Sequence, residues 1–274
     1  MIDKDVEMKL LWILLLAHVV VDFILQSDAL VAEKEKFIIK SFLHHTLTQF
    51  FVTFILLNLL NGPIVKIIFI SLIVSISHLI IDLIMQVFKS KRFALLVFSL
   101  DQIAHFIILI FVSLLFINTF SAFNQAVIFV LQKIQPLFFE SQASKLFSFT
   151  TIKFIIILCI TVFVGSVFVK KILTDCKDLK DSEPDNTKSV EYKQTIATGK
   201  IIGYFERLII FLLVLTNNIA ATTWILTAKS IVRFDKIKKN EMEDGLNYAE
   251  YYLIGTLSSS AFAIIMGILG KELL

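Results

Sequence analysis

The chain has 274 residues, of which 57% are hydrophobic and only 18% are charged. A formal net charge of +3 and a mean hydropathy of +0.83 exclude a soluble globular protein and give no reason to expect nucleic acid as a partner. The composition is typical of an all-α, polytopic transmembrane helical bundle that is surrounded by membrane lipids.

Seven apolar runs of about 20 residues predict six to seven spanning helices. The number depends on the sixth run, which is expected either to cross the membrane or to form a re-entrant hairpin at Asn217 and Asn218. These runs are 8–26, 41–60, 64–88, 93–117, 149–173, 201–228 and 248–269. Three parts are expected: a four-helix His/Asp core (1–117), an interfacial segment (118–148), and C-terminal membrane helices with two polar loops (149–274).

The first and third runs share the spacing HxxxDxxxQ, formed by His18, Asp22 and Gln26 and again by His78, Asp82 and Gln86. Residues four apart share one face of a helix. Titratable side chains in the bilayer core cost several kcal/mol, so their recurrence indicates a function rather than chance. Ordinary hydrogen bonding between helices is the structural alternative.

The second and fourth runs add His44, His45, Asp101 and His105. At a rise of 1.5 Å per residue, these residues and the two HxxxD pairs differ in depth by less than about 10 Å. The four helices therefore predict one shared layer in a bundle, formed by a duplicated hairpin.

Imidazole with carboxylate suits a divalent metal such as Zn, Mn or Fe. Because His44 and His45 point about 100° apart, only one of them is expected to face the core. Asp101 is the predicted base. Glutamines near the site either orient the ligands or join helices. The predicted metal ligands are His18, Asp22, His44, His45, His78, Asp82 and His105.

Arg207 follows Glu206 near the start of the sixth run. This arginine is predicted either to hold an anionic group of a substrate or to reach the headgroups with Glu206 as its partner. Lysine and arginine in the loops after the first, third and fifth helices predict that those loops are cytoplasmic and that the N-terminus lies outside.

Together the motifs resemble the bacterial membrane proteins known as domain of unknown function 3307, over about residues 10–115. The matching elements are AHxxxDFxLQ, a following AEK turn, a histidine pair, SHxxxD and DQxxH. The segments GKxIGxxER, AKSIxRF and AEYYLIGTLxS are similar to an extension that many members carry. The resemblance implies a multi-pass protein of the bacterial cytoplasmic (inner) membrane, and a looser similarity to membrane-bound metal-dependent hydrolases favours hydrolysis.

The leading hypothesis is a metal-dependent hydrolase of an amphiphilic substrate, such as a lipid or polyprenyl phosphate ester. The alternative is a transporter that moves protons or metal ions through the same layer. Transporters usually interrupt their site helices with Gly or Pro, and the first four runs contain neither internally. A structural subunit is the third hypothesis, and a homo-oligomer is left open.

Overall fold

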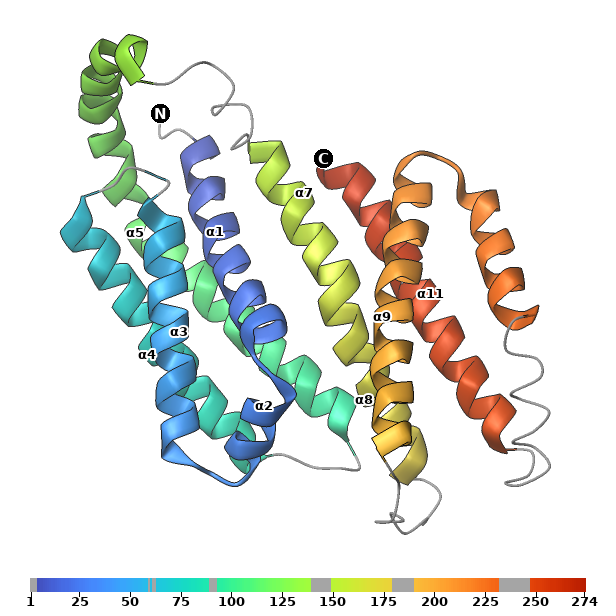
Figure 1. Ribbon diagram of the computed structural model, residues 1–274. Helices are drawn as coiled ribbons and strands as arrows, with labels where there is room; N and C mark the ends of the chain where they lie inside the picture. Colours follow the sequence, from blue (N-terminus) through green and yellow to red (C-terminus); the bar gives the residue numbers. More distant parts are fainter. Residues whose placement is uncertain are drawn as a thin grey trace. The chain divides into compact units, whose positions relative to one another are not determined.

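The computed structural model describes the backbone of residues 4–58, 60, 63–88, 93–138, 149–178, 190–231 and 247–274. Side chains are described in 9–58, 60, 63–88, 93–116, 149–176, 199–231 and 250–274. These parts of the chain are helical and contain no strand, which confirms the all-α fold (Figure 1).

The helices follow one another along the chain with short breaks, and residues 222–231 are also helical. The bounds are α1 (Lys4–Val19), the π-helix η1 (Val20–Leu25), α2 (Asp28–Glu35), α3 (Ile39–Asn58), α4 (Ile64–Val87), α5 (Ala94–Phe138), α7 (Phe149–Cys159), the π-helix η2 (Ile160–Val164), α8 (Gly165–Asp178), α9 (Val190–Leu215), the 3-10 helix η3 (Ile219–Ala221) and α11 (Asn247–Leu273).

By length and composition, four described helical stretches are suited to cross a membrane: Ile64–Val87, Ala94–Phe116, Phe149–Cys176 and Glu250–Leu273. A fifth candidate is the pair Lys9–Leu25 and Asp28–Glu35, which is bent by 91°. This supports a membrane protein with four or five candidate crossings among the described residues, and the six to seven crossings predicted are not confirmed. Helix α3 falls short because polar side chains, including His45 and Gln49, lie within it.

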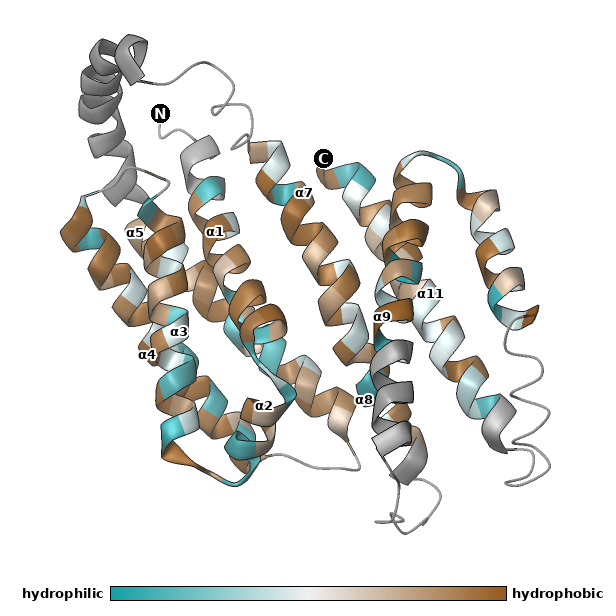
Figure 2. Cartoon of the chain, in the orientation of Figure 1, coloured by the Kyte–Doolittle hydropathy of each residue, from teal (hydrophilic) through white to brown (hydrophobic). Residues whose placement is uncertain are grey.

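The chain divides into two compact units, residues 1–89 with 97–156 and residues 90–96 with 157–274. In the first unit, α1, α3, α4 and α5 share a core, while large apolar side chains such as Phe51 and Phe69 are exposed. Hydrophilic residues gather at α2 and the first half of α3 (Figure 2). Since lipid tails are as apolar as leucine, close packing rather than burial from water holds such helices together. The core residues are Leu10, Ile13, Leu14, Leu57, Ile67, Ile70, Val74, Leu109 and Val112.

The AEK element, expected to form a turn, is instead part of helix α2. After η1 the chain becomes extended at Gln26, and Ser27 caps α2 by accepting a hydrogen bond from the Leu30 amide at 3.2 Å. A serine at this position is favoured because it satisfies one of the free amides in the first turn. The chain therefore bends by 91° between the first helix and α2 before α3 begins.

In the second unit, α9 ends at Leu215 and the chain reverses at 216–218. Asn217 has φ 63°, in the left-handed region that asparagine tolerates. Lys229 lies 2.5 Å from Glu206, so the helix at 222–231 returns alongside α9. The chain thus reverses at the asparagine pair, where the hairpin form of the sixth run was predicted to turn.

Helix α11 packs closely on α9 through glycine. A Cβ atom on Gly267 would lie 2.6 Å from the Val214 Cβ, and one on Gly270 would lie 3.1 Å from Leu215. Small residues at membrane helix interfaces let backbones approach in this way.

At the start of α5, the Asp175 carboxylate accepts hydrogen bonds from the Ala94 and Leu95 amides at 2.7 and 3.1 Å.

Several expected segments fall partly outside the described residues. Side chains of the expected interfacial segment 118–148 are not among them, and α5 continues through its first part to Phe138. The polar loop expected at 174–198 is helical up to Asp178 and again from Val190, with 179–189 outside the described residues. In the second expected polar loop, 229–247, residues 232–246 lie outside them.

Candidate metal centre

The end of α1 and the π-helix η1 present the first two residues of the site. His18 Nδ1 lies 3.7 Å from a carboxylate oxygen of Asp22. His18 is buried, and the side chain of Asp22 is 9% exposed. A π-helical turn widens the helix and redirects its side chains, and such turns are frequent at functional sites. The first HxxxD pair therefore faces the interior of the first unit.

Helices α3 and α4 bring two further imidazoles to Asp22. The Nε2 atoms of His45 and His78 lie 3.0 Å apart, and each is 3.2 Å from the same oxygen of Asp22. His45 is buried, whereas His44 is exposed. Because adjacent helical residues point about 100° apart, α3 contributes one imidazole to the site, and it is that of His45.

Asp82 lies one turn after His78 and faces three imidazoles. Its Oδ1 atom is 3.8 Å from Nε2 of His78 and 3.8 Å from Nε2 of His105. Its Oδ2 atom is 3.8 Å from Nε2 of His45. These separations are too long for hydrogen bonds, so these carboxylate and ring atoms converge without bonding one another.

His105, on α5, has one nitrogen without a hydrogen-bond partner. Its Nδ1 atom donates to the carbonyl oxygen of Asp101 at 2.9 Å, which places the ring proton on that nitrogen. The lone pair is then on Nε2, which is buried and unpartnered among the described residues. The ring is only 3% exposed, so bulk water does not satisfy this lone pair.

Gln102 connects His18 to Asp101. Its amide oxygen is 3.2 Å from Nε2 of His18, and its amide nitrogen donates to the Asp101 carboxylate at 2.9 Å. This arrangement leaves Nδ1 of His18 facing the cluster. Metal-binding histidines are commonly oriented by such a bond to the other ring nitrogen. Gln49, in contrast, donates to Thr53 within its own helix.

Lys34 is a site residue that is absent from the set predicted from the sequence. Its ammonium lies 2.5 Å from Oδ2 of Asp82 and is only 7% exposed. The Gln26 amide can accept from Lys34 at 2.9 Å while it donates to the Asp22 carbonyl at 3.2 Å. The AEK element, which ends at Lys34, is the signal in the sequence that marks this position.

The donor atoms of these residues lie close enough to hold a metal ion. Within each of three overlapping groups, one ligand atom per residue lies within 4.8 Å of the others. A tetrahedral zinc with ligands at about 2.1 Å separates them by about 3.4 Å, which lies within the observed 3.0–3.8 Å. The residues therefore fit a divalent cation with nitrogen and oxygen ligands. The groups are His18/Asp22/His78/His105, His45/His78/Asp82 and Asp82/Asp101/His105.

Arg207 lies in the second unit and is also buried. Its Nε and Nη2 atoms donate to the carbonyl oxygen of Val162 at 3.2 and 3.0 Å, and Nη1 donates to Ser259 at 3.1 Å. Val162 belongs to the π-helix η2, where regular backbone pairing is interrupted. Glu206 instead pairs with Lys229. The expectation that Glu206 is the partner of Arg207 is therefore wrong, because this carboxylate has another cation.

The structure thus brings most of the predicted site residues together in the first unit and leaves two of them out. His44 is exposed on α3, and Arg207 belongs to the second unit. The residues that converge are His18, Asp22, His45, His78, Asp82, Asp101 and His105.

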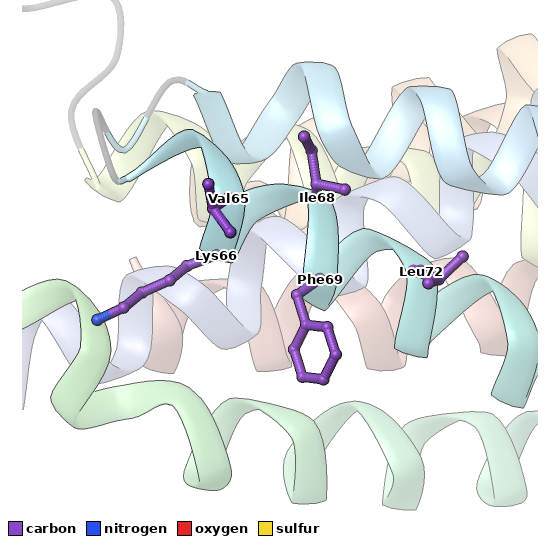
Figure 3. A pocket seen from close by; sticks show the side chains of 5 residues that line it. All are labelled: Val65, Lys66, Ile68, Phe69 and Leu72. Carbon is purple, nitrogen blue, oxygen red and sulfur yellow. The ribbon is translucent and has the colours of Figure 1, made fainter.

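A surface hollow on α4 is separate from these residues (Figure 3). It is lined by Val65, Lys66, Ile68, Phe69 and Leu72. All of them lie in the first half of the helix, whereas His78 and Asp82 lie in its second half. The hollow offers no imidazole or carboxylate, so it is not part of the candidate metal centre.

Comparison with protein families gives a match that covers this cluster. Residues 10–134 match the family described as protein of unknown function (DUF3307). The match confirms the resemblance that the motifs carry. The DUF3307 segment includes every residue of the candidate metal centre, from His18 to His105, and Lys34 as well. Comparison with curated proteins and with solved structures gives no match.

Proposed function

We propose that the chain is an integral membrane hydrolase that depends on a divalent metal, Zn, Mn or Fe(II). The observation that carries this proposal is Nε2 of His105, a buried lone pair without a hydrogen-bond partner that faces Asp82. Burying several carboxylates and imidazoles together is costly, and metal coordination offsets that cost.

A divalent metal bound here supplies a Lewis acid and makes water easier to deprotonate. Asp101 is the proposed base, since its carboxylate lies 3.6 Å from the His105 ring at the edge of the cluster. It takes a proton from the water that attacks phosphorus and returns it to the alkoxide oxygen as the P–O bond breaks, so that this group leaves as the alcohol. The Gln102 amide, bonded to both Asp101 and His18, keeps this carboxylate in place.

The proposed substrate is an amphiphile with a lipid or polyprenyl phosphate ester. The site lies among helices with exposed apolar side chains, such as Phe51 on α3 and Phe106 on α5, which support access from the lipid phase. Arg207 is the residue predicted from the sequence for the anionic head. Because its guanidinium is buried and donates hydrogen bonds to Val162 and Ser259, a structural role in the second unit is favoured instead.

The proposed setting is the bacterial inner membrane, with six to seven crossings and a duplicated hairpin. Helix α3 has 20 residues, which is about 30 Å and enough to cross a bilayer despite its polar face. Each of the hairpins α1–α3 and α4–α5 supplies an HxxxD pair from its first part. The second helix of each adds a histidine, which is His45 on α3 and His105 on α5. That correspondence supports duplication. A second copy of the chain is a further proposed partner.

The test is metal analysis of the detergent-purified protein beside the Asp22→Asn/Asp82→Asn variant. We expect bound metal in the wild type and its loss in the variant. Phosphate release from phosphatidic acid and from a polyprenyl phosphate in mixed micelles should follow the metal content. A folded wild type that binds no metal and releases no phosphate contradicts the proposal.

A specific observation favours the transporter as the second candidate. The first helix is interrupted beside Asp22 by η1 and the 91° bend before α2, although it contains neither Gly nor Pro. Interrupted helices often flank ion sites in transporters. Uptake of zinc or protons into proteoliposomes, abolished by Asp82→Asn and without phosphate release, would support this alternative.

A further inference from the structure

Helix α2 contacts the other helices of the first unit through a charged side chain. Lys34 is its one buried residue, while Val31 and Ala32 are exposed. Helices that lie at a membrane surface normally dock through an apolar stripe. A helix that inserts an ammonium group instead indicates that the contact serves the group it reaches.

That group is Asp82, whose two oxygens have different neighbours. Oδ2 accepts from Lys34 at 2.5 Å, and Oδ1 faces the Nε2 atoms of His78 and His105 at 3.8 Å. Oδ2 is also 3.8 Å from Nε2 of His45. The lysine therefore fixes the rotation of the carboxylate and leaves Oδ1, which faces His78 and His105, unoccupied. Asp82 and the imidazoles could then hold a metal without loss of the contact with Lys34.

Both ends of α2 hold the lysine in this position. Ser27 caps the first turn, and Ser41 at the start of α3 donates to the Glu33 carboxylate. After α2, Phe37 has φ 53°, a left-handed conformation that is rare for an aromatic residue. Residues held in such conformations cluster at functional sites, where surrounding contacts maintain them.

The charges of the cluster also involve Lys34. Metal ligation requires neutral imidazoles, so the charged groups are the carboxylates of Asp22, Asp82 and Asp101 and the ammonium of Lys34. They leave two uncompensated negative charges, and one divalent cation balances them.

We propose that Lys34 is a positioning residue of the metal centre, which holds Asp82 toward the imidazoles and couples metal binding to the docking of α2. The inference rests on the proposed metal centre. Coupling between two sites is reciprocal. If the docking of α2 strengthens metal binding through Lys34, then metal binding must stabilise the docked position of α2 by the same free energy. Helix α2 is thus the surface segment whose order depends on metal occupancy.

The test compares Lys34→Met with Lys36→Met, a matched change at an exposed lysine two residues further on. Zinc affinity is measured by competition with a chelator, and hydrogen exchange of residues 28–36 is followed with and without zinc. We expect Lys34→Met to weaken zinc binding by about 10- to 100-fold and Lys36→Met to leave it unchanged. Zinc should slow exchange of α2 in the wild type and in Lys36→Met, and not in Lys34→Met.

Lys34→Arg keeps the positive charge and is the second variant if Lys34→Met does not fold. Its zinc affinity should stay within about tenfold of the wild type. The inference is overturned if Lys34→Met binds zinc as tightly as the wild type or more tightly. It is also overturned if zinc does not change the hydrogen exchange of α2 in the wild type. If Asp22→Asn/Asp82→Asn loses zinc while Lys34→Met keeps full zinc affinity, the metal centre stands and only the role of Lys34 is overturned. A folded wild type without zinc affinity overturns the metal centre as well.

Discussion

Nε2 of His105 lies 3.8 Å from Oδ1 of Asp82 and has no hydrogen-bond partner in the described part of the chain. A nitrogen lone pair and a carboxylate oxygen both carry negative charge density, so they repel each other. Packing of α4 against α5 nevertheless places them face to face. A cation between them stabilises both groups, which makes metal binding the property to test first.

The adjacent histidines of α3 should differ in their effect on metal binding. His45→Ala removes an imidazole that touches Asp22 and His78, and should lower zinc affinity by at least about tenfold. His44→Ala changes an exposed ring and should leave the affinity unchanged. Chelator competition on both purified variants gives the comparison. Equal losses, or a larger loss from His44→Ala, would contradict the observed face of α3.

Gln102→Ala should weaken metal binding without removing a ligand. The change releases Nε2 of His18 and one oxygen of Asp101, so both groups lose a fixed orientation. Outer partners of metal ligands typically contribute about 10- to 100-fold in affinity. The control is Gln86→Ala, since the side chain of Gln86 forms no hydrogen bond within the described residues and its backbone carbonyl accepts one from Phe88. If the two variants bind zinc equally, Gln102 only joins helices.

Gly267→Ala should destabilise the second unit. The added methyl would meet Val214 at 2.6 Å, and overpacking of this kind costs about 1–3 kcal/mol. Gly199→Ala is the control, because its methyl meets nothing within 4 Å. In a helix interior that change should stabilise by about 0.5–1 kcal/mol. Thermal unfolding in detergent distinguishes the two, and an unchanged Gly267→Ala would show that α9 and α11 can separate.

Arg207→Met should lower stability and leave metal content unchanged. The variant leaves the Val162 carbonyl and the Ser259 hydroxyl without their buried donor, a loss of about 1–3 kcal/mol. The measurements are thermal unfolding and metal analysis of the same sample. A variant with wild-type stability that no longer processes an anionic substrate would instead support the role in binding an anionic head.

The HxxxD spacing sufficed to predict which faces of α1 and α4 meet, because residues four apart must share a helix face. Sequence alone left the choice between His44 and His45 open, since it depends on how α3 is rotated in the bundle. The role of Lys34 could not be predicted, because a short charged stretch resembles a solvated loop. The burial of Lys34 depends on a sharp bend of the chain at Gln26. The partner of Arg207 is a backbone carbonyl freed by a π-helix, and side-chain patterns do not reveal such groups.

Every side chain of the candidate centre lies between His18 and His105, in the first half of the chain. The ribosome therefore completes all four ligand-bearing helices while most of the second unit, residues 157–274, is still untranslated. At about 5–20 residues per second, that interval lasts on the order of ten seconds. If the candidate centre binds a metal, the nascent chain can take it up during membrane insertion, and the ions present at the translocation site would then set which metal is bound.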